Sequence, residues 1–401
     1  MCTISSWHSH KLGVMPSGPE VDAIPTVRAR RLQGTGTIEV VFQISPSSTR
    51  DDDRGQFASL AEQALGALFA HGLGPSNIVC GWIHFAKAPG WDWREALASA
   101  WEASGPLPIS AILQPPAAPF CCCTLQLHTV RSARQSGVWY GNSNKPAAAT
   151  ILRAGARHLR LMSITPRPEL RDSADMVDMV FDMLAQAGHA LTDRGLGFRD
   201  VVRTWIYVRD IEHNYGFVNQ ARNRYFEEQH LVRLPASTCV EGALCGAAAP
   251  VAMDLYAVAA NAEVCVQAVA PGPMGEASAY GSAFARGSLI VEPGRKTLYV
   301  SGTASIDVRG AVVAMGDIQG QLHCMFENVR ALLVRAGMDL RDVVSATAYL
   351  KRAADYRDFV TAAAARGLTA ELPIAVVVAD ICRPDWLCEM EVCAVQSKPE
   401  K

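Results

Sequence analysis

One short segment occurs three times in this 401-residue chain, and this repetition constrains the fold more than any other feature. Each copy begins with glycine, follows an Ala/Leu-rich stretch of helical period and leads into a strand-like run. Glycine at the end of a helix accepts the left-handed backbone conformation without a Cβ penalty, so each copy predicts a helix end followed by a strand. The three copies are Gly72–Val79, Gly195–Val202 and Gly337–Val344.

The sequence around each copy repeats the same order of predicted elements. A strand opens each unit, a second helical stretch follows the repeated segment, and a Leu-Pro pair then introduces two strands. This order predicts an α+β fold of three tandem units, each a sheet with helices on one face. We place the units at residues 1–130, 131–265 and 266–401, with linkers near Arg131–Gly155 and Pro271–Tyr280. The first helix of each unit is expected at Phe57–His71, Met176–Thr192 and Ile318–Ala336, and the strand after each repeated segment at Cys80–Phe85, Arg203–Val208 and Ser345–Leu350.

The last predicted strand pair, within Leu372–Val395, contains two carboxylates. Residues alternate between apolar and polar after a turn at residues 383–385, which puts Glu389 and Glu391 on one face of a strand whose other face is apolar. Carboxylates are seldom fully buried without a partner. Each glutamate is therefore solvated on an exposed face, paired with arginine, or held in a polar pocket.

Charge and cysteine spacing argue against several classes of protein. The net charge of −2 and the lack of a Lys/Arg tract argue against a nucleic-acid partner. The first residues lack a signal-peptide core, and no run of membrane-spanning length is free of charge or proline, so we expect a cytoplasmic protein without a membrane partner. The twelve cysteines lack the close pairs of a zinc site, so we expect reduced core thiols and no metal.

The order of helix end, strand, helix, Leu-Pro and strand pair resembles the Rid (YjgF) family three times over. Members of that family are homotrimers with clefts between subunits. The resemblance implies that this chain builds the same ring alone, as a pseudo-trimer, so that the protein is a monomer or at most a loose dimer. Rid imine deaminases carry an arginine two residues after the Pro of the fifth strand, and here those positions hold Ser110, Ser237 and Ala375. Their loss argues against hydrolysis of simple imino acids, because none of them can form a bidentate contact with a carboxylate.

The last two units also resemble the chorismatases, which share this Rid-like fold and act on the enol-pyruvyl ether of chorismate. Two departures are Asp307–Gly310, where chorismatases would carry a Gly-His pair, and Cys239, where a glycine is more usual. The matching residues are Arg203-Thr-Trp205-Ile-Tyr207, Tyr215, Asn219, Arg222, Phe284-Ala-Arg286, Ser301–Ile306, Gly316-Asp317, Gln321, Asn328, Tyr349-Leu350, Cys382-Arg383 and Glu389.

This resemblance implies a site without a cofactor. Glu389 would be the catalytic acid, with a pKa raised by burial or by Glu391, and its proton would go to the methylene carbon of a dianionic substrate. The implied substrate-binding residues are Arg203, Tyr215, Arg222, Arg286, Ser301, Thr303, Tyr349, Cys382 and Arg383. Each has a structural alternative: arginines can lie on the surface or in ion pairs, the hydroxyls can satisfy strand ends, Tyr349 can be core, and a buried cysteine is usually inert. Trp139–Asn142 is either a lid or a solvated loop.

Three functions remain open from the sequence. The first is a chorismatase-like enzyme that cleaves or rearranges a small enol-ether or cyclohexadiene carboxylic acid of secondary metabolism. The second is a Rid-type hydrolase, deaminase or cyclisation enzyme for another imine-bearing or unsaturated intermediate. The third is a non-catalytic module that binds a small anion. The distances among Glu389, Arg203, Arg222 and Arg286 discriminate among them, because only the enzymes need the acid and the cations in one cavity.

Overall fold

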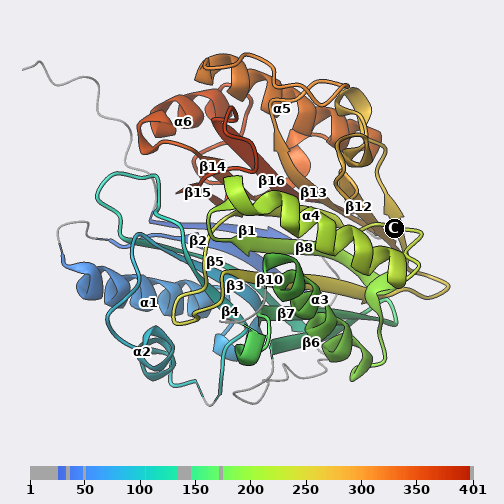
Figure 1. Ribbon diagram of the computed structural model, residues 1–401. Coiled ribbons are helices and arrows are strands. Elements are labelled where there is room, and N and C mark those ends of the chain that lie inside the picture. The colour runs from blue at the N-terminus through green and yellow to red at the C-terminus, as the bar shows by residue number, and fades with distance from the viewer. Residues whose placement is uncertain are drawn as a thin grey trace, which may run out of the picture.

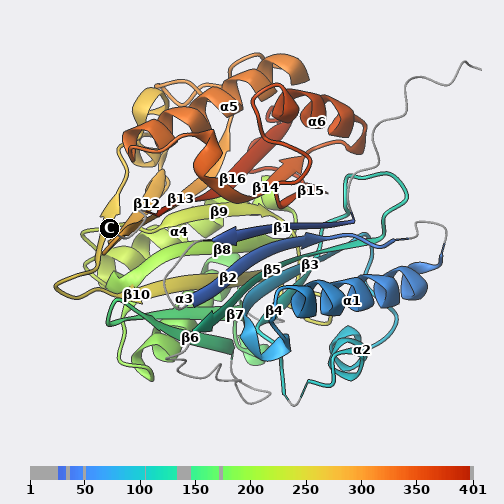
Figure 2. The same ribbon diagram turned by 180° about the vertical axis from the view of Figure 1, so that it is seen from behind.

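The computed structural model describes residues 26–32, 37–47, 51–103, 105–132, 146–170 and 175–397. Trp139–Asn142, the predicted lid or loop, lies outside them. The described chain forms three sheets that lie side by side, with the helices outside them, as Figures 1 and 2 show from opposite sides. No helix in this part of the chain is long and apolar enough to cross a membrane.

Each sheet belongs to one unit and has two helices packed against it. The first has the order β1-β2-β5-β3-β4 and is built from β1 (Val27–Leu32), β2 (Thr37–Ile44), β3 (Ile78–Phe85), β4 (Ile109–Leu113) and β5 (Cys123–Ser132), with helices α1 (Asp53–Ala70) and α2 (Trp93–Ala100). The second has the order β6-β7-β10-β8-β9 and is built from β6 (Ala147–Arg153), β7 (Ala156–Ile164), β8 (Val201–Val208), β9 (Ala236–Glu241) and β10 (Val251–Ala259), with α3 (Met176–Thr192) and α4 (Ile211–Glu228). The third has the order β11-β12-β13-β16-β14-β15 and is built from β11 (Cys265–Ala268), β12 (Gly287–Glu292), β13 (Arg295–Ala304), β14 (Val343–Leu350), β15 (Ile374–Val378) and β16 (Cys388–Ser397), with α5 (Ile318–Arg335) and α6 (Tyr356–Ala364).

The repeated segments end helices as the sequence predicts. Gly72, Gly195 and Gly337 have φ angles of +69°, +69° and +71°, in the left-handed region that glycine enters most easily. A short 3₁₀ turn then leads into the strand, which begins at Ile78, Val201 or Val343, two residues earlier than predicted. This shift reflects β-branched residues at the end of each repeated segment, which favour the strand.

The three sheets are joined by a repeating set of side-chain hydrogen bonds. Strands β3, β8 and β14 carry a first set of equivalent residues, which are residues 82, 205 and 347. Each of them lies opposite a residue of its own sheet, and these opposite residues, 126, 254 and 391, form a second set. Each residue of the first set donates a hydrogen bond to the residue of the second set that belongs to the next unit. The bonds are Trp82 Nε1 to Asp254 (2.9 Å), Trp205 Nε1 to Glu391 (2.8 Å) and Thr347 Oγ1 to Gln126 (3.1 Å). This cyclic pattern makes the chain a pseudo-trimer.

The backbone continues the same cycle outside the regular strands. Isolated bridges join Ile112 to Leu244, Val240 to Ile381 and Pro116 to Val377, so every unit pairs with both others. An apolar cluster that draws on all three sheets, including Ile112, Tyr256 and Tyr349, packs between the units. The chain therefore has three equivalent seams, and each can hold a pocket between neighbouring units.

Four strands were not predicted, namely β1, β6, β11 and β12. β6 lies inside the segment Arg131–Gly155, which the sequence analysis assigns to a linker, because its three alanines hide the alternating pattern of a strand. β11 begins at Cys265, the last residue assigned to the second unit, yet it pairs with β12 of the third sheet. The segment Pro271–Tyr280, predicted as a linker between units, lies instead between β11 and β12 of the third sheet and contains two 3₁₀ turns, Gly272–Met274 and Ala277–Tyr280.

Candidate active site between the second and third units

The alternation along β16 places Glu389 against the second unit. Cys388, Met390 and Val392 point into the core beneath α5, so Glu389 and Glu391 point to the opposite face. That face is covered by the second unit, which leaves Glu389 only 4% exposed. The exposed-face alternative therefore does not hold for this glutamate.

Glu389 lines a small pocket in the seam between these units. Its floor comes from β13 and β16, and its far wall comes from β9 and α4. The empty space among these side chains measures about 420 Å³, with the adjoining open solvent included. The lining residues are Tyr215, Arg222, Ser237, Cys239, Phe284, Arg286, Gly302, Ala304, Ile306, Cys382, Trp386 and Glu389.

Two buried guanidinium groups face the same pocket. Arg222, on α4, is 1% exposed and donates to Asn219 Oδ1 at 2.6 Å, and Arg286 is 2% exposed and donates from Nε to the Gly275 carbonyl at 3.1 Å. They lie 5.4 and 5.5 Å from the centroid of the Phe284 ring. Within the described residues, Arg222 has no carboxylate partner and its Nε has no acceptor. A buried cation of this kind is suited to binding an anionic ligand.

The environment of Glu389 favours its neutral form. Burial raises the pKa of its carboxyl group to about 8, and the nearby charge of Glu391 acts in the same direction, against the opposing effects of Arg203 and Arg286. At neutral pH the side chain is therefore a carboxylic acid that can donate a proton. A pKa near the working pH is what a general acid requires.

Tyr215 and Cys382 complete one side of the pocket. The Tyr215 hydroxyl lies 3.1 Å from Ser282 Oγ, and burial raises its pKa well above the usual value, so it stays neutral. Burial also raises the pKa of the Cys382 thiol well above its usual value. Since the thiolate is the reactive form, Cys382 is a wall residue rather than a nucleophile.

The structure places the other five predicted substrate-binding residues outside this pocket. Arg203 forms an ion pair with Glu391 across the seam at 2.5 Å, and it donates to Thr238 on the neighbouring strand β9 of its own sheet. Ser301 Oγ accepts from the Ser237 amide at 2.9 Å and joins the two units, and Thr303 Oγ1 donates back to the Ser301 carbonyl. The remaining two are Tyr349, which belongs to the apolar cluster between the units, and Arg383, which donates to the Gly310 carbonyl and stacks on Trp386.

Gly302 is a pocket residue that the sequence analysis did not single out. It lies at a β-bulge, where β13 carries one more residue than β16, and its amide donates to Thr238 Oγ1 at 2.9 Å. A Cβ atom at this position would overlap Glu389 Oε1 and would lie 3.2 Å from Thr238 Cγ2. A glycine inside a predicted strand is the signal that would have pointed to this close approach.

Replacing Gly302 by alanine should therefore displace the acid. We expect the Gly302→Ala variant to lose about tenfold or more in kcat, since a misplacement of about 1 Å costs up to roughly 100-fold. Steady-state kinetics on the substrate proposed below provide the measurement. Gly216→Ala is the matched control, because Gly216 is exposed on α4 and an alanine methyl there would have no atom within 4 Å, so this variant should keep full activity. Equal activity of the two variants would contradict the assigned position of Glu389.

The other two seams lack the acid. Glu389 pairs with Tyr349 across the third sheet, and the equivalent pairs are Ala252 with Tyr207 and Thr124 with His84. Alanine and threonine cannot act as general acids, so of these three equivalent positions only the one in the third sheet carries a carboxyl group. No cluster of three or more metal-ligating side chains occurs in the described part of the chain.

Comparison with known proteins agrees with this architecture. The chain is 39% identical over 62 residues to a RutC family protein of Pyrococcus horikoshii, which covers 16% of this chain and 47% of the relative, and 36% identical over 97 residues to one of Pyrococcus abyssi, which covers 24% and 65%. The chain thus spans about half to two thirds of the length of these curated relatives. The crystal structure of a chorismatase is similar over 88% of this chain and 98% of its own, with a TM-score of 0.59 and 17% identity, which shows a shared fold.

A family model matches in two tandem segments. The model is that of endoribonuclease L-PSP, the family to which the Rid (YjgF) resemblance refers, and it matches residues 164–259 and 283–396. These segments lie within the second and third units and together make up just over half of the chain. The chain therefore belongs to the endoribonuclease L-PSP family.

Proposed function

We propose that this protein is a chorismatase-like enzyme that cleaves the enol-pyruvyl ether of a small cyclohexadiene dicarboxylic acid without a cofactor. The observation that carries the proposal is a neutral Glu389 that shares a buried pocket with Arg222 and Arg286. The chorismatase-like fold supports it as well. Chorismate is the substrate that best matches two cations and a proton donor.

The two guanidinium groups would each hold one substrate carboxylate. Arg222 and Arg286 lie at similar distances from the Phe284 ring, and both side chains are buried. Charge-assisted contacts of this kind both bind and orient a carboxylate. Tyr215 adds a neutral hydroxyl to the same wall.

Glu389 would then start the reaction. Its proton forms the new C–H bond at the methylene carbon of the enol ether, and an oxocarbenium centre develops on the adjacent carbon. Water adds to that carbon and returns a proton to the Glu389 carboxylate. The resulting hemiketal breaks its ether C–O bond, the hydroxyl proton moves to the ring oxygen, and pyruvate leaves with a dihydroxycyclohexadiene acid.

Incubation of the purified protein with chorismate tests this function. We expect pyruvate to form in a one-to-one ratio with the chorismate consumed, measured by a coupled assay and by ultraviolet spectra. Iminopropionate discriminates between this function and a Rid-type deaminase. We expect no turnover of it, because the positions of the carboxylate-binding Rid arginine hold Ser110, Ser237 and Ala375. Turnover of the imine without turnover of chorismate would favour a Rid-type deaminase instead.

Loss of the Arg222 cation should weaken substrate binding. A hydrogen bond to a charged group contributes about 1.5–3 kcal/mol, so we expect Arg222→Gln to raise KM roughly 10- to 150-fold. Arg224→Gln is the matched control on the same helix, because Arg224 is exposed, pairs with Glu228 at 3.0 Å and lies over the Phe181 ring, away from the pocket. An unchanged KM in Arg222→Gln would remove this residue from the proposed site.

The proposed site needs no second copy of the chain, since both sides of the seam come from one molecule. We propose that the protein acts as a monomer. Size-exclusion chromatography with light scattering should give a mass near 43.1 kDa. An obligate assembly of three chains would contradict the pseudo-trimer as the working unit.

A further inference from the structure

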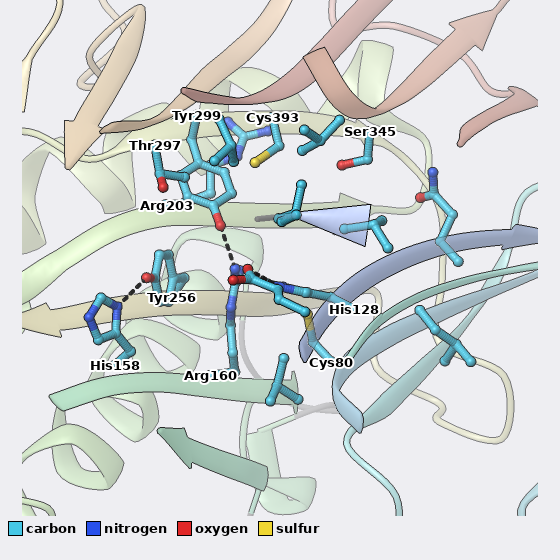
Figure 3. Close-up of a pocket in the computed structure, with 18 of the residues that line it drawn as sticks. Cys80, His128, His158, Arg160, Arg203, Tyr256, Thr297, Tyr299, Ser345 and Cys393 are labelled. Carbon is cyan, nitrogen blue, oxygen red and sulfur yellow. Dashed lines mark hydrogen bonds and ion pairs between the residues drawn. The ribbon is translucent and has the colours of Figure 1, made fainter. Parts of the chain in front are cut away.

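A second cavity lies where the three sheets meet, and it shares no residue with the seam pocket. Strands of all three units line it, and Figure 3 shows the side chains that converge there. Its empty space measures about 910 Å³, with the open mouth included. The walls combine apolar side chains, such as Val41, Val79, Ile151 and Val344, with an unusual number of charged ones.

Three arginines around this cavity have carboxylate partners. Arg295 donates to both oxygens of Glu39 at 2.6 and 2.9 Å. Arg153 donates to Glu292 at 2.8 Å, and Arg203 pairs with Glu391 as described above. Each of these three pairs has no net charge.

Arg160 is the fourth arginine, and its charge is not balanced. Its Nη2 donates to the Tyr299 hydroxyl at 2.6 Å, and its guanidinium lies 3.7 Å from the centroid of the Tyr256 ring. Figure 3 shows its tip in the cavity between these two tyrosines. The side chain is only 5% exposed, and among the described residues its Nη1 has no acceptor and the guanidinium has no carboxylate partner.

The other titratable groups nearby do not supply the missing negative charge. Burial raises the pKa of the Cys80 and Cys393 thiols to about 11 and that of Tyr256 to about 12, and it raises the pKa of Tyr299 well above its usual value. Burial lowers the pKa of His158 to about 4 and also lowers that of His128. All of these groups are neutral at pH 7, so the cavity keeps one net positive charge.

From this geometry we propose that the central cavity binds a small monocarboxylate, whose carboxylate pairs with Arg160 and whose apolar body lies along the valine- and isoleucine-lined walls. A buried cation without a counter-ion is destabilising, and cation–π contacts offset this cost only in part. An anion on Nη1 removes that cost. The apolar walls favour a carboxylate with a hydrocarbon or aromatic body over an inorganic ion, because they gain nothing from the latter. The proposal is independent of the reaction in the seam.

Crystals grown with 4-bromobenzoate test this site through the anomalous signal of bromine. We expect a bromine peak in the central cavity, with the carboxylate on Arg160. Absence of that peak, or a peak only beside Arg222 and Arg286, would overturn the proposal. Crystals grown with sodium bromide form a second arm, and a bromide ion on Arg160 in place of 4-bromobenzoate would show an inorganic-anion site and contradict the carboxylate assignment.

Calorimetric titration with benzoate adds a measurement in solution. We expect Arg160→Gln to weaken benzoate binding about tenfold or more. Arg160→Lys keeps the positive charge but not the planar bidentate donor, so it should weaken binding less. Arg222→Gln should leave binding to the central cavity intact, since Arg222 lines only the seam pocket. Unchanged binding in Arg160→Gln, or a loss confined to Arg222→Gln, would place the ligand elsewhere. If Arg160→Gln does not fold, Arg160→Lys and the bromine peak of the wild type still decide the question.

Discussion

Replacing Glu389 by glutamine should lower kcat on chorismate by roughly 10²- to 10⁴-fold, which is the range that general acid catalysis contributes. Glutamine has nearly the same shape, and the wild-type side chain is already neutral at pH 7, so the pocket should keep its structure. The variant should therefore bind substrate with little change in KM. Pyruvate release under saturating chorismate gives the measurement.

A matched control separates loss of the acid from loss of any carboxyl group. Glu263 is exposed in a bend and lies far from Glu389 in the sequence, so Glu263→Gln should retain full activity. Circular dichroism and thermal unfolding should show both variants folded. Undiminished pyruvate formation by Glu389→Gln would exclude this residue as the proton donor.

The same substitution should change how stability depends on pH. Glu389 has a folded-state pKa of about 8, raised by burial, against roughly 4.3 for an unfolded glutamate. A raised pKa means that the folded state holds the proton more tightly, so its contribution to stability is complete below pH of about 4. That contribution is lost as pH rises from there through about 8, where the folded protein must ionise a buried carboxyl group.

Glutamine cannot ionise and escapes this loss. The wild type and Glu389→Gln should have similar unfolding free energies near pH 4, and at pH 9 the variant should be more stable by roughly 5 kcal/mol, the linkage value for such a shift. Urea unfolding across this range measures the difference, with Glu263→Gln again as the control. A constant difference between wild type and Glu389→Gln from pH 4 to 9 would contradict a raised pKa.

The sequence predicts the fold well where each element leaves a local signal. Helix α3 occupies the predicted range Met176–Thr192 without a shift, and the three capping glycines have the left-handed conformation expected of them. Local signals failed for β6, where alanines carry no strong preference for a strand or a loop. Repetition of the pattern located the other twelve strands, but it did not compensate for this gap, because β1, β11 and β12 at the start of the first and third sheets were missed as well.

The candidate site was predictable only in part. Strand alternation and the family resemblance pointed to Glu389, Arg222 and Arg286, and the structure brings these three into one pocket. The partner of Arg203 could not be read from the sequence, because it depends on how β8 of one unit packs against β16 of the next, 188 residues away. The unbalanced charge of Arg160 likewise arises only when the units assemble, because all three sheets line its cavity.

Direct titration of Glu389 tests the central claim, that one seam of the pseudo-trimer holds a neutral carboxylic acid beside two guanidinium groups. Carbon NMR of protein labelled at the glutamate side-chain carboxyl, with Glu389→Gln to assign the signal, follows this group alone. The account predicts a midpoint near pH 8. A midpoint near pH 4, the value of a solvated glutamate, would contradict it.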